Sequence, residues 1–151
     1  MGNFQPPVAK QQTLTFLSSH PQKVAGAVQT AGMTSGVAQA FQQTGRPQPV
    51  QGNSAPVAGD LAYWAANKGT YKSVATATGP QDLGRVTAYT VSNLLNGKGP
   101  KVSVITQPSV VIDESNLDQF VVAGAAPTSQ ATIETNGQWL PDTFLAPLFS
   151  E

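Results

Sequence analysis

The stretch that decides the fold is PQPVQGNSAPVAGDL, residues 47–61. Residues 49–51 predict a short strand, and residues 52–54, Gly-Asn-Ser, predict a tight polar turn after it. A helix follows with Pro56 near its first turn, where proline is tolerated because the backbone N–H has no intrahelical partner. In open α/β sheets, ligands bind where a strand opens into a polar loop before a helix.

The same strand–loop–helix pattern occurs on either side of this stretch. Residues 24–29, VAGAVQ, form an apolar run typical of a strand buried on both faces, and a helix begins near Met33. Residues 71–78 carry the alternation of a third strand. Short connections and right-handed crossovers then predict an α/β fold: a three-layer αβα arrangement around a parallel sheet, with these strands as neighbours in chain order.

Helical spacing of apolar residues predicts which helix faces are buried. A first helix is expected over residues 3–20, with Leu14, Phe16 and Leu17 as its buried stripe. The helix after the third strand has the most regular apolar spacing in the chain and ends at Gly97. Its predicted buried residues are Leu83, Val86, Val91, Leu94 and Leu95.

Beyond Gly97 the sequence changes character. Residues 101–112 are extended and apolar, residues 113–120 could form a short helix, and residues 123–136 are small and polar. The apolar tail, residues 139–149, must pack back onto the body or onto a partner.

Composition excludes several function classes. Charged residues make up 11% of the chain and the formal net charge is zero, so neither nucleic acid nor an anionic membrane would be attracted by charge. There is no cysteine, which removes thiol catalysis and thiolate metal sites. No apolar run reaches the roughly 18 residues of a membrane span, and the N-terminus lacks the features of a signal peptide.

Catalytic and cofactor motifs are also missing from the sequence. No glycine-rich dinucleotide fingerprint follows a strand, and there is no P-loop. Asp60 and Asp82 fall on different predicted helices, where acids near the N-terminus favour the helix dipole. The sequence therefore predicts no enzyme, no cofactor and no metal site.

Several segments, taken in order, resemble a known family. They are residues 2–41, QGNSAP at 51–56, SVATATGPQDLGR at 73–85 and LLNGKGPKVSVIT at 94–106. Together they resemble the C-terminal lobe of periplasmic sugar-binding proteins of ABC importers, in the ribose- and galactose-binding class. The resemblance implies a partial lobe over residues 1–122, lacking its first β-α-β, and a C-terminal extension over residues 123–151. It also implies a parent protein outside the cytoplasm that delivers sugar to an ABC permease.

The resemblance places sugar contacts in the loops after the predicted strands. A monosaccharide or small polyol offers hydroxyls that need paired donors and acceptors, and a ring face that stacks on an aromatic side chain. The implied ligand-binding residues are Phe4, Thr30, Asn53, Ser54, Thr78 and Gln81. Half a cleft makes half the hydrogen bonds, so the chain alone is expected to bind sugar weakly or not at all.

Two other functions fit the same pattern. The effector-binding core of a sugar-responsive transcription repressor shares the fold, but it needs a basic helix-turn-helix that this sequence lacks. A structural half-lobe that binds no sugar is the third interpretation, and a sugar titration would separate it from the first.

The predicted edge at residues 24–29 has no charge and no proline, and the strand that would lie beside it is absent. We therefore expect a homo-oligomer, or association with a missing N-terminal lobe. The surfaces expected to associate are this edge, the N-terminal helix and the tail. Alternatively, the tail folds back and covers the exposed surface.

Overall fold

The computed structural model describes residues 3–30, 32–77, 79–106, 109–133 and 140–150. The chain forms two compact units. Unit 1 comprises Met1–Ala77 and Val111–Ile133, and unit 2 comprises Thr78–Val110 and Glu134–Glu151. Thr78, a predicted ligand-binding residue, and residue 139, the first of the predicted apolar tail, lie outside the described residues.

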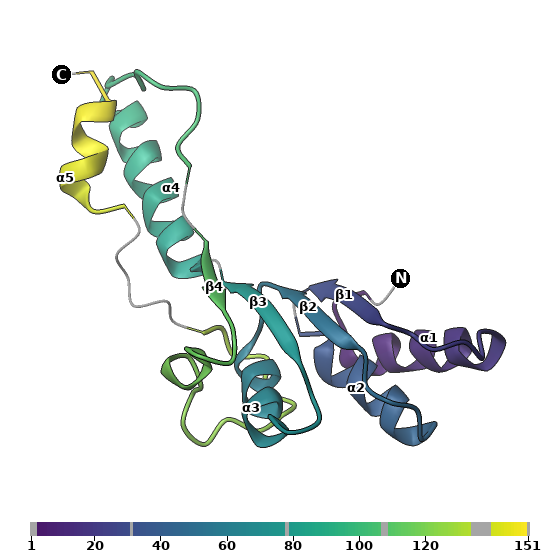
Figure 1. Cartoon of the computed structure of the whole chain (residues 1–151). Coiled ribbons are helices and arrows are strands. Elements are labelled where there is room, and N and C mark those ends of the chain that lie inside the picture. The colour runs from purple at the N-terminus through teal and green to yellow at the C-terminus, as the bar shows by residue number, and fades with distance from the viewer. Residues whose placement is uncertain (1–2, 31, 78, 107–108, 134–139, 151) are drawn as a thin grey trace. The chain divides into compact units, whose positions relative to one another are not determined.

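The described residues contain a four-stranded sheet whose strands follow in chain order (Figure 1). β1 pairs with β2 and β2 with β3, both in parallel. The predicted parallel order of the first three strands is therefore confirmed, and so is the α/β fold class. The strands are β1 (Gly26–Thr30), β2 (Val50–Ser54), β3 (Ser73–Ala77) and β4 (Val110–Ile112).

The predicted turn at residues 52–54 is wrong, because β2 continues through Ser54. Ser54 lies opposite Thr30 on one side and Thr76 on the other. The extended backbone directs Asn53 into the buried layer, where its amide makes hydrogen bonds that a turn would forfeit. The chain turns instead at Ala55, whose φ is +57°.

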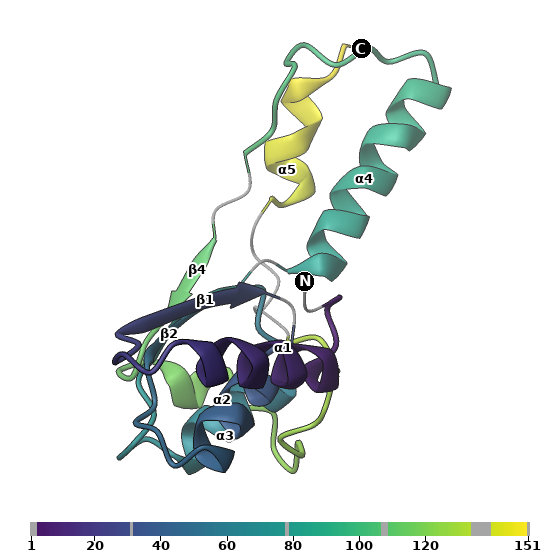
Figure 2. The same ribbon diagram turned by 90° about the vertical axis from the view of Figure 1, so that its right-hand side faces the viewer.

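Three helices of unit 1 lie together on one side of β1 and β2 (Figure 2). Helix α1 packs closely on α2 at Gly36, where a Cβ atom would lie 2.1 Å from the carbonyl oxygen of Pro6. In the predicted stripe of the first helix, Leu17 is buried, whereas Phe16 is 45% exposed and stacks on the ring of His20. The helices are α1 (Pro6–Ser19), α2 (Thr34–Gln43) and α3 (Ala58–Ala66).

The other face of the sheet carries exposed valines. Val28 is 89% exposed, and Val50 and Val74 lie on the same face, exposed by 57% and 45%. Burial of β1 on both faces is therefore wrong. Strand alternation points Val28 away from the helices of unit 1 and turns Gln29 toward them.

The core of unit 1 gathers around α3. Leu61 and Trp64 are buried on this helix, and Trp64 meets the ring of Tyr71 edge-on at 6.5 Å. Leu117 is fully buried on the short 3-10 helix Leu117–Gln119, which is the helical part of the predicted segment 113–120.

The first turn of α3 is closed by a distant part of the same unit. The N–H groups of Ala58 and Gly59 donate to the carbonyl oxygens of Ala131 and Ser129, at 2.8 and 3.0 Å. Glycine is required at position 59, because a Cβ there would lie 2.6 Å from the Ser129 oxygen.

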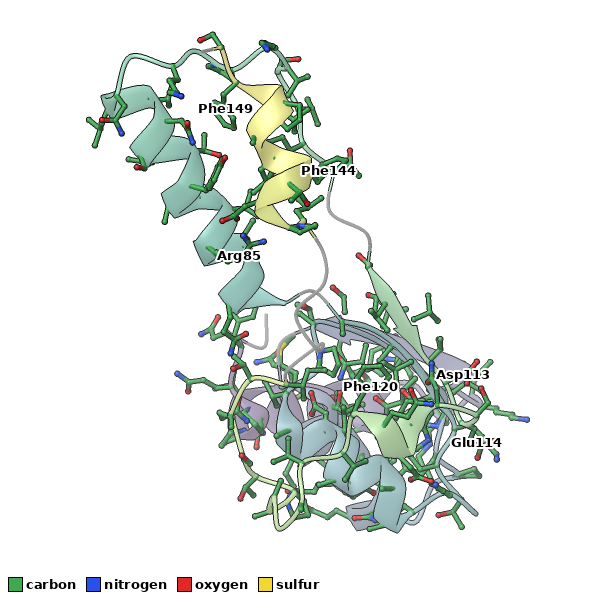
Figure 3. The ribbon with its side chains drawn as sticks, turned by 90° about the vertical axis from the view of Figure 1, so that its left-hand side faces the viewer. Arg85, Asp113, Glu114, Phe120, Phe144 and Phe149 are labelled. Atoms are coloured by element: carbon green, nitrogen blue, oxygen red, sulfur yellow. The ribbon has the colours of Figure 1, made fainter. Side chains whose placement is uncertain are left out.

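Unit 2 is built on α4 (Pro80–Leu95) and the C-terminal segment, which contains α5 (Asp142–Leu145) and a 3-10 turn (Ala146–Leu148). Figure 3 shows Arg85 and Phe149 in this unit. The guanidinium of Arg85 pairs with Asp142 at 2.6 Å, and the rings of Phe149 and Tyr89 meet edge-on at 5.8 Å. The described part of the tail therefore packs back onto α4.

The predicted buried stripe of α4 is largely wrong. Val86 is buried against Leu140 and Leu145, but the tail is short and covers only one strip of the helix. The other predicted residues are exposed by 47 to 83%: Leu83, Val91, Leu94 and Leu95.

Candidate functional site

The carboxyl ends of β1 and β2 bring two of the predicted site residues together. Thr30 and Ser54 are paired in the sheet register, and the Thr30 hydroxyl donates to the Ser54 carbonyl oxygen at 2.7 Å. Ser54 is exposed, so its hydroxyl faces solvent at the edge where parallel sheets bind ligands. We call this pair the strand-end pair.

Asn53 lies beneath the strand-end pair and is only 5% exposed. Its side-chain amide donates to the Thr34 hydroxyl at 2.7 Å and to a carboxylate oxygen of Asp60 at 2.9 Å. Asn53 thereby ties the end of β2 to the first turns of α2 and α3. Its amide therefore helps to fix the position of the strand-end pair. Its NH₂ group already donates two hydrogen bonds inside the protein.

The Asn53 contact belongs to a buried layer of polar side chains that sequence reasoning missed. The Gln29 amide donates to the Thr34 hydroxyl at 2.8 Å and also to the side-chain oxygen of Gln51. Gln29 and Gln51 are 8% and 0% exposed. The available signal was their alternation with valine or glycine along β1 and β2, which places them on one face.

Asp60 is the ionisable member of this layer and is 3% exposed. Burial raises the pKa of its carboxyl group, while hydrogen bonds from the Asn53 amide and the Val57 N–H act in the opposite direction. Hydrogen bonds from the Thr34 side chain and the Gly32 backbone also lower the pKa of this carboxyl group. The carboxyl group is enclosed, so it cannot serve as a solvent-facing ligand for hydroxyls.

The remaining predicted site residues lie in other parts of the chain's sequence and are described one by one. Phe4 precedes α1 in unit 1, is 65% exposed and has a φ of +55°. Gln81 is exposed in the first turn of α4, in unit 2. Thr78 lies outside the described residues, so convergence of all six side chains stays a prediction.

Gln130, an exposed residue that sequence reasoning missed, lies near the loop that follows β1. Gly32 has a φ of +79°, and the position of its missing Cβ lies 2.4 Å from the side-chain oxygen of Gln130. The Gln130 amide thus reaches the loop that follows Thr30. Hydroxyl and amide groups, uncharged and accessible, can exchange hydrogen bonds with the hydroxyls of a small ligand.

Comparison with solved structures identifies the architecture. An ABC transporter solute-binding protein from Agrobacterium vitis with bound allitol matches with a TM-score of 0.61 and 22% identity, over 74% of this chain and 39% of that one. A solute-binding protein from Bacillus halodurans with bound myo-inositol matches with a TM-score of 0.61 and 16% identity, over 77% and 39%. A sugar ABC transport substrate-binding protein from Bordetella parapertussis gives 0.61 and 17%, over 91% and 43%.

The chain has the fold of part of an ABC-transporter sugar-binding protein. It spans well under half the length of the solved structures that it matches. No family model matches the sequence, and no curated protein matches it. The resemblance drawn from the sequence segments is therefore confirmed by the fold.

Within this sugar-binding-protein fold, the described residues contain no group of three acidic or histidine side chains that could hold a metal ion. No helix in the described part of the chain is long and apolar enough to cross a membrane. The groups offered at the candidate site are hydroxyls, amides and backbone.

Proposed function

We propose that the chain binds a monosaccharide or small polyol as part of the C-terminal lobe of the substrate-binding component of an ABC importer. The observation that carries the proposal is the strand-end pair, Thr30 and Ser54, at the carboxyl edge of a parallel sheet. Solved structures with the same fold are solute-binding proteins with bound allitol or myo-inositol.

The chemistry of the edge supports a neutral, hydroxyl-rich ligand. The Ser54 and Thr30 hydroxyls and the Gln130 amide are uncharged, so they favour hydroxyls over phosphates or carboxylates. Phe4 is exposed, so its ring is accessible for stacking on a sugar face. Phe4, Asn53, Thr78 and Gln81 remain parts of the proposed site, with Asn53 acting from below.

The proposal includes the setting of the parent protein. A second lobe would close over the ligand. The two lobes together would then deliver the ligand to an ABC permease outside the cytoplasm. The role is binding without catalysis. The division into a lobe over residues 1–122 and an extension over residues 123–151 stays part of this proposal, and so does self-association of the chain.

The test is a titration of the full chain with pentoses, hexoses and inositols, followed by amide chemical shifts in NMR. One open edge leaves the ligand half in water, so we expect millimolar or weaker affinity. Shifts should concentrate at Thr30, Ser54 and Gln130. Binding at micromolar concentration would contradict the expectation that the isolated chain binds weakly.

Paired variants sharpen this test. Ser54→Ala removes an exposed hydroxyl from the edge. At a fixed sugar concentration, the sugar-induced change in the Thr30 amide shift should fall by about threefold or more, because one hydrogen bond to the sugar is lost. Ser18→Ala removes an exposed hydroxyl that bonds only within α1 and should leave the titration unchanged. If Ser54→Ala leaves the shifts unchanged, or if Ser18→Ala weakens them as much as Ser54→Ala does, the proposed binding edge is wrong.

A further inference from the structure

A surface segment of unit 1 crosses the first turn of α3 after the short 3-10 helix (Figure 1). Buried side chains fix it on both sides, because Leu117 is 0% exposed and Ile133 is 2% exposed. Residues 127–132 between them lie at or near the surface, and we call them the strap. A stretch with few buried apolar contacts can open locally while the rest of the fold stays intact.

Backbone hydrogen bonds attach the strap to α3. The Ser129 carbonyl oxygen accepts from the Gly59 N–H at 3.0 Å, and the Ala131 carbonyl oxygen accepts from the Ala58 N–H at 2.8 Å. N–H groups in the first turn have no partner inside the helix, so the strap supplies the acceptors that they need. Neither bond uses a side chain of the strap, so substitution of a strap side chain leaves both bonds in place.

Gly59 sets how closely the strap lies on α3. A Cβ atom at this position would lie 2.6 Å from the Ser129 carbonyl oxygen and 2.7 Å from the Pro127 carbonyl oxygen. These are backbone atoms that no side-chain rotation can move, so any larger residue must push the strap away from the helix. The helix itself tolerates alanine here, because alanine is a better helix former than glycine. Gly59→Ala therefore releases the strap selectively.

The attached strap presents Gln130 beside the loop that follows β1. The Ser129 N–H donates to the Ala126 carbonyl oxygen at 2.8 Å, and Gln130 is exposed directly after this turn. The side-chain oxygen and nitrogen of Gln130 lie 2.4 and 3.2 Å from the position of the missing Cβ of Gly32, two residues after Thr30. A side-chain amide holds a donor and an acceptor side by side, which suits two neighbouring hydroxyls of one ligand.

We propose that the strap positions Gln130 as a specificity-determining residue of the proposed sugar site. In the attached state, the Gln130 amide binds hydroxyls of a ligand that the strand-end pair also contacts. Release moves the amide away, and the strand-end pair then binds the same ligand alone. Groups held in place before binding lose less entropy, so the attached strap gives the tighter site. The inference rests on the proposed function and adds a positioning role for Gly59.

The first experiment measures the attachment of the strap in the full chain without ligand. Hydrogen exchange at the Ala58 amide reports its bond to the strap, and Gly59→Ala should accelerate this exchange at least about tenfold. Gly84→Ala is the matched control, because it makes the same change inside α4, where a Cβ would meet nothing within 4 Å. Far-UV circular dichroism checks that both variants fold. Unchanged exchange at Ala58 in Gly59→Ala would overturn the proposal.

The second experiment titrates myo-inositol into the same proteins and follows the Thr30 and Ser54 amides by NMR. Gly59→Ala and Gln130→Ala should each raise the dissociation constant about threefold or more, the effect of one lost hydrogen bond. The double variant should be no weaker than Gln130→Ala alone, because both changes remove the same contact. Gly84→Ala should bind like the natural chain. Additive losses would overturn the proposal, since a purely structural effect of Gly59→Ala would add to that of Gln130→Ala.

A disulfide tests the same role without a change at Gly59. Val57 and Thr132 form an antiparallel bridge, and the spacing of such pairs suits a disulfide. The sequence has no cysteine, so Val57→Cys and Thr132→Cys can pair only with each other within one chain. The oxidised form should bind myo-inositol at least as tightly as its reduced form, and Gln130→Ala should weaken this binding about threefold. An oxidised chain whose dissociation constant does not respond to Gln130→Ala would overturn the proposal.

Failure of this inference is distinguishable from failure of the proposed function. Ser54→Ala removes a hydroxyl of the strand-end pair and leaves the bonds between the strap and α3 in place. If Ser54→Ala weakens binding and Gln130→Ala does not, the sugar site stands and the strap has no part in recognition. If neither variant changes the titration, the proposed site fails and the inference fails with it.

Discussion

The two faces of the unit 1 sheet are reversed in polarity. On the face toward the helices, Gln29 and Gln51 are buried, while on the other face Val28, Val50 and Val74 are exposed. Burying an amide is costly unless it is hydrogen-bonded, and a valine left in water forfeits roughly 1.5–3 kcal/mol relative to full burial. The inner amides offset part of this cost by hydrogen-bonding to one another and to the Thr34 hydroxyl.

The comparison separates two roles. The inner face holds the helices in place through specific hydrogen bonds and through small side chains, since Ala75 and Ala77 are buried there. The outer face contributes little to the stability of unit 1 and is available for contact. Substitutions on the two faces should therefore have very different effects, and the following predictions test that difference, beginning with the largest.

Adjacent positions on β3 provide the strongest test. Ala75→Lys places a long charged side chain at a position that is 2% exposed and should lower the free energy of unfolding by more than about 3 kcal/mol, or prevent folding. Val74→Lys, one residue earlier on the outer face, should change it by less than about 1 kcal/mol. Urea unfolding measures both. Similar losses in the two variants would show that both faces are buried in solution.

The stability of the buried polar layer should depend on the hydrogen-bond acceptor at residue 60 more than on the negative charge of that residue. Asp60→Ala removes the acceptor for the Asn53 amide and the Val57 N–H and should cost about 1–3 kcal/mol. Asp60→Asn keeps an oxygen for both donors and should be at least as stable as the natural chain at neutral pH. An Asp60→Asn variant as unstable as Asp60→Ala would mean that the carboxylate charge itself is needed.

Sequence patterns predicted the parts of this structure that rest on local signals. The three strand–loop–helix repeats predicted the parallel order of β1, β2 and β3, and Gly97, the predicted end of the helix after the third strand, has the positive φ angle of a helix end. The sequence placed Thr30 and Ser54 at one edge of the sheet, because carboxyl ends of neighbouring parallel strands meet there, but it put Ser54 in a turn, whereas Ser54 pairs with Thr30 within the strand register.

The features that the sequence did not predict depend on long-range contacts. The inward orientation of Gln29, Gln51 and Asn53 is set by mutual hydrogen bonds between segments far apart in the chain. An apolar run normally marks a strand buried on both faces, so the sequence did not predict that Val28 would be exposed and Gln29 buried. Gln130 lies about 100 residues from Gly32 in sequence, and no local pattern links them.

Ala55, at the carboxyl end of β2, has a strained backbone conformation. Ala55 follows β2 with a φ of +57° and donates its N–H to the Thr76 carbonyl oxygen at 2.9 Å. A left-handed conformation costs a residue with a Cβ roughly 1–2 kcal/mol. Glycine avoids this strain, but it also makes the unfolded chain more flexible, which cancels part of the gain in stability. Ala55→Gly should therefore raise the free energy of unfolding by about 0.5–1 kcal/mol. A loss of stability in thermal and urea unfolding would show that the turn has a different backbone in solution.

The smallest expected effect is the pH dependence that Asp60 confers on the inner face. Burial raises the pKa of its carboxyl group above the ordinary value of 3.8, and hydrogen bonds from Asn53 and Val57 oppose the shift. The folded chain therefore holds this proton more tightly than the unfolded chain does. The sign follows from linkage: stability should fall as pH rises from about 3.8 through the raised pKa and stay constant above it.

The measurement compares urea midpoints of the natural chain and Asp60→Asn across this range. Other acids titrate in both proteins, including Asp113, whose pKa is lowered by hydrogen bonds from Ser115, so the difference between the two proteins isolates Asp60. Relative to the variant, the natural chain should gain stability on acidification. A relative loss on acidification would mean that the folded state favours the carboxylate. Charge-assisted hydrogen bonds to an ionised Asp60 would then hold the inner layer together. A buried charge of this kind would depart further from ordinary protein structure than the exposed valines of the outer face do.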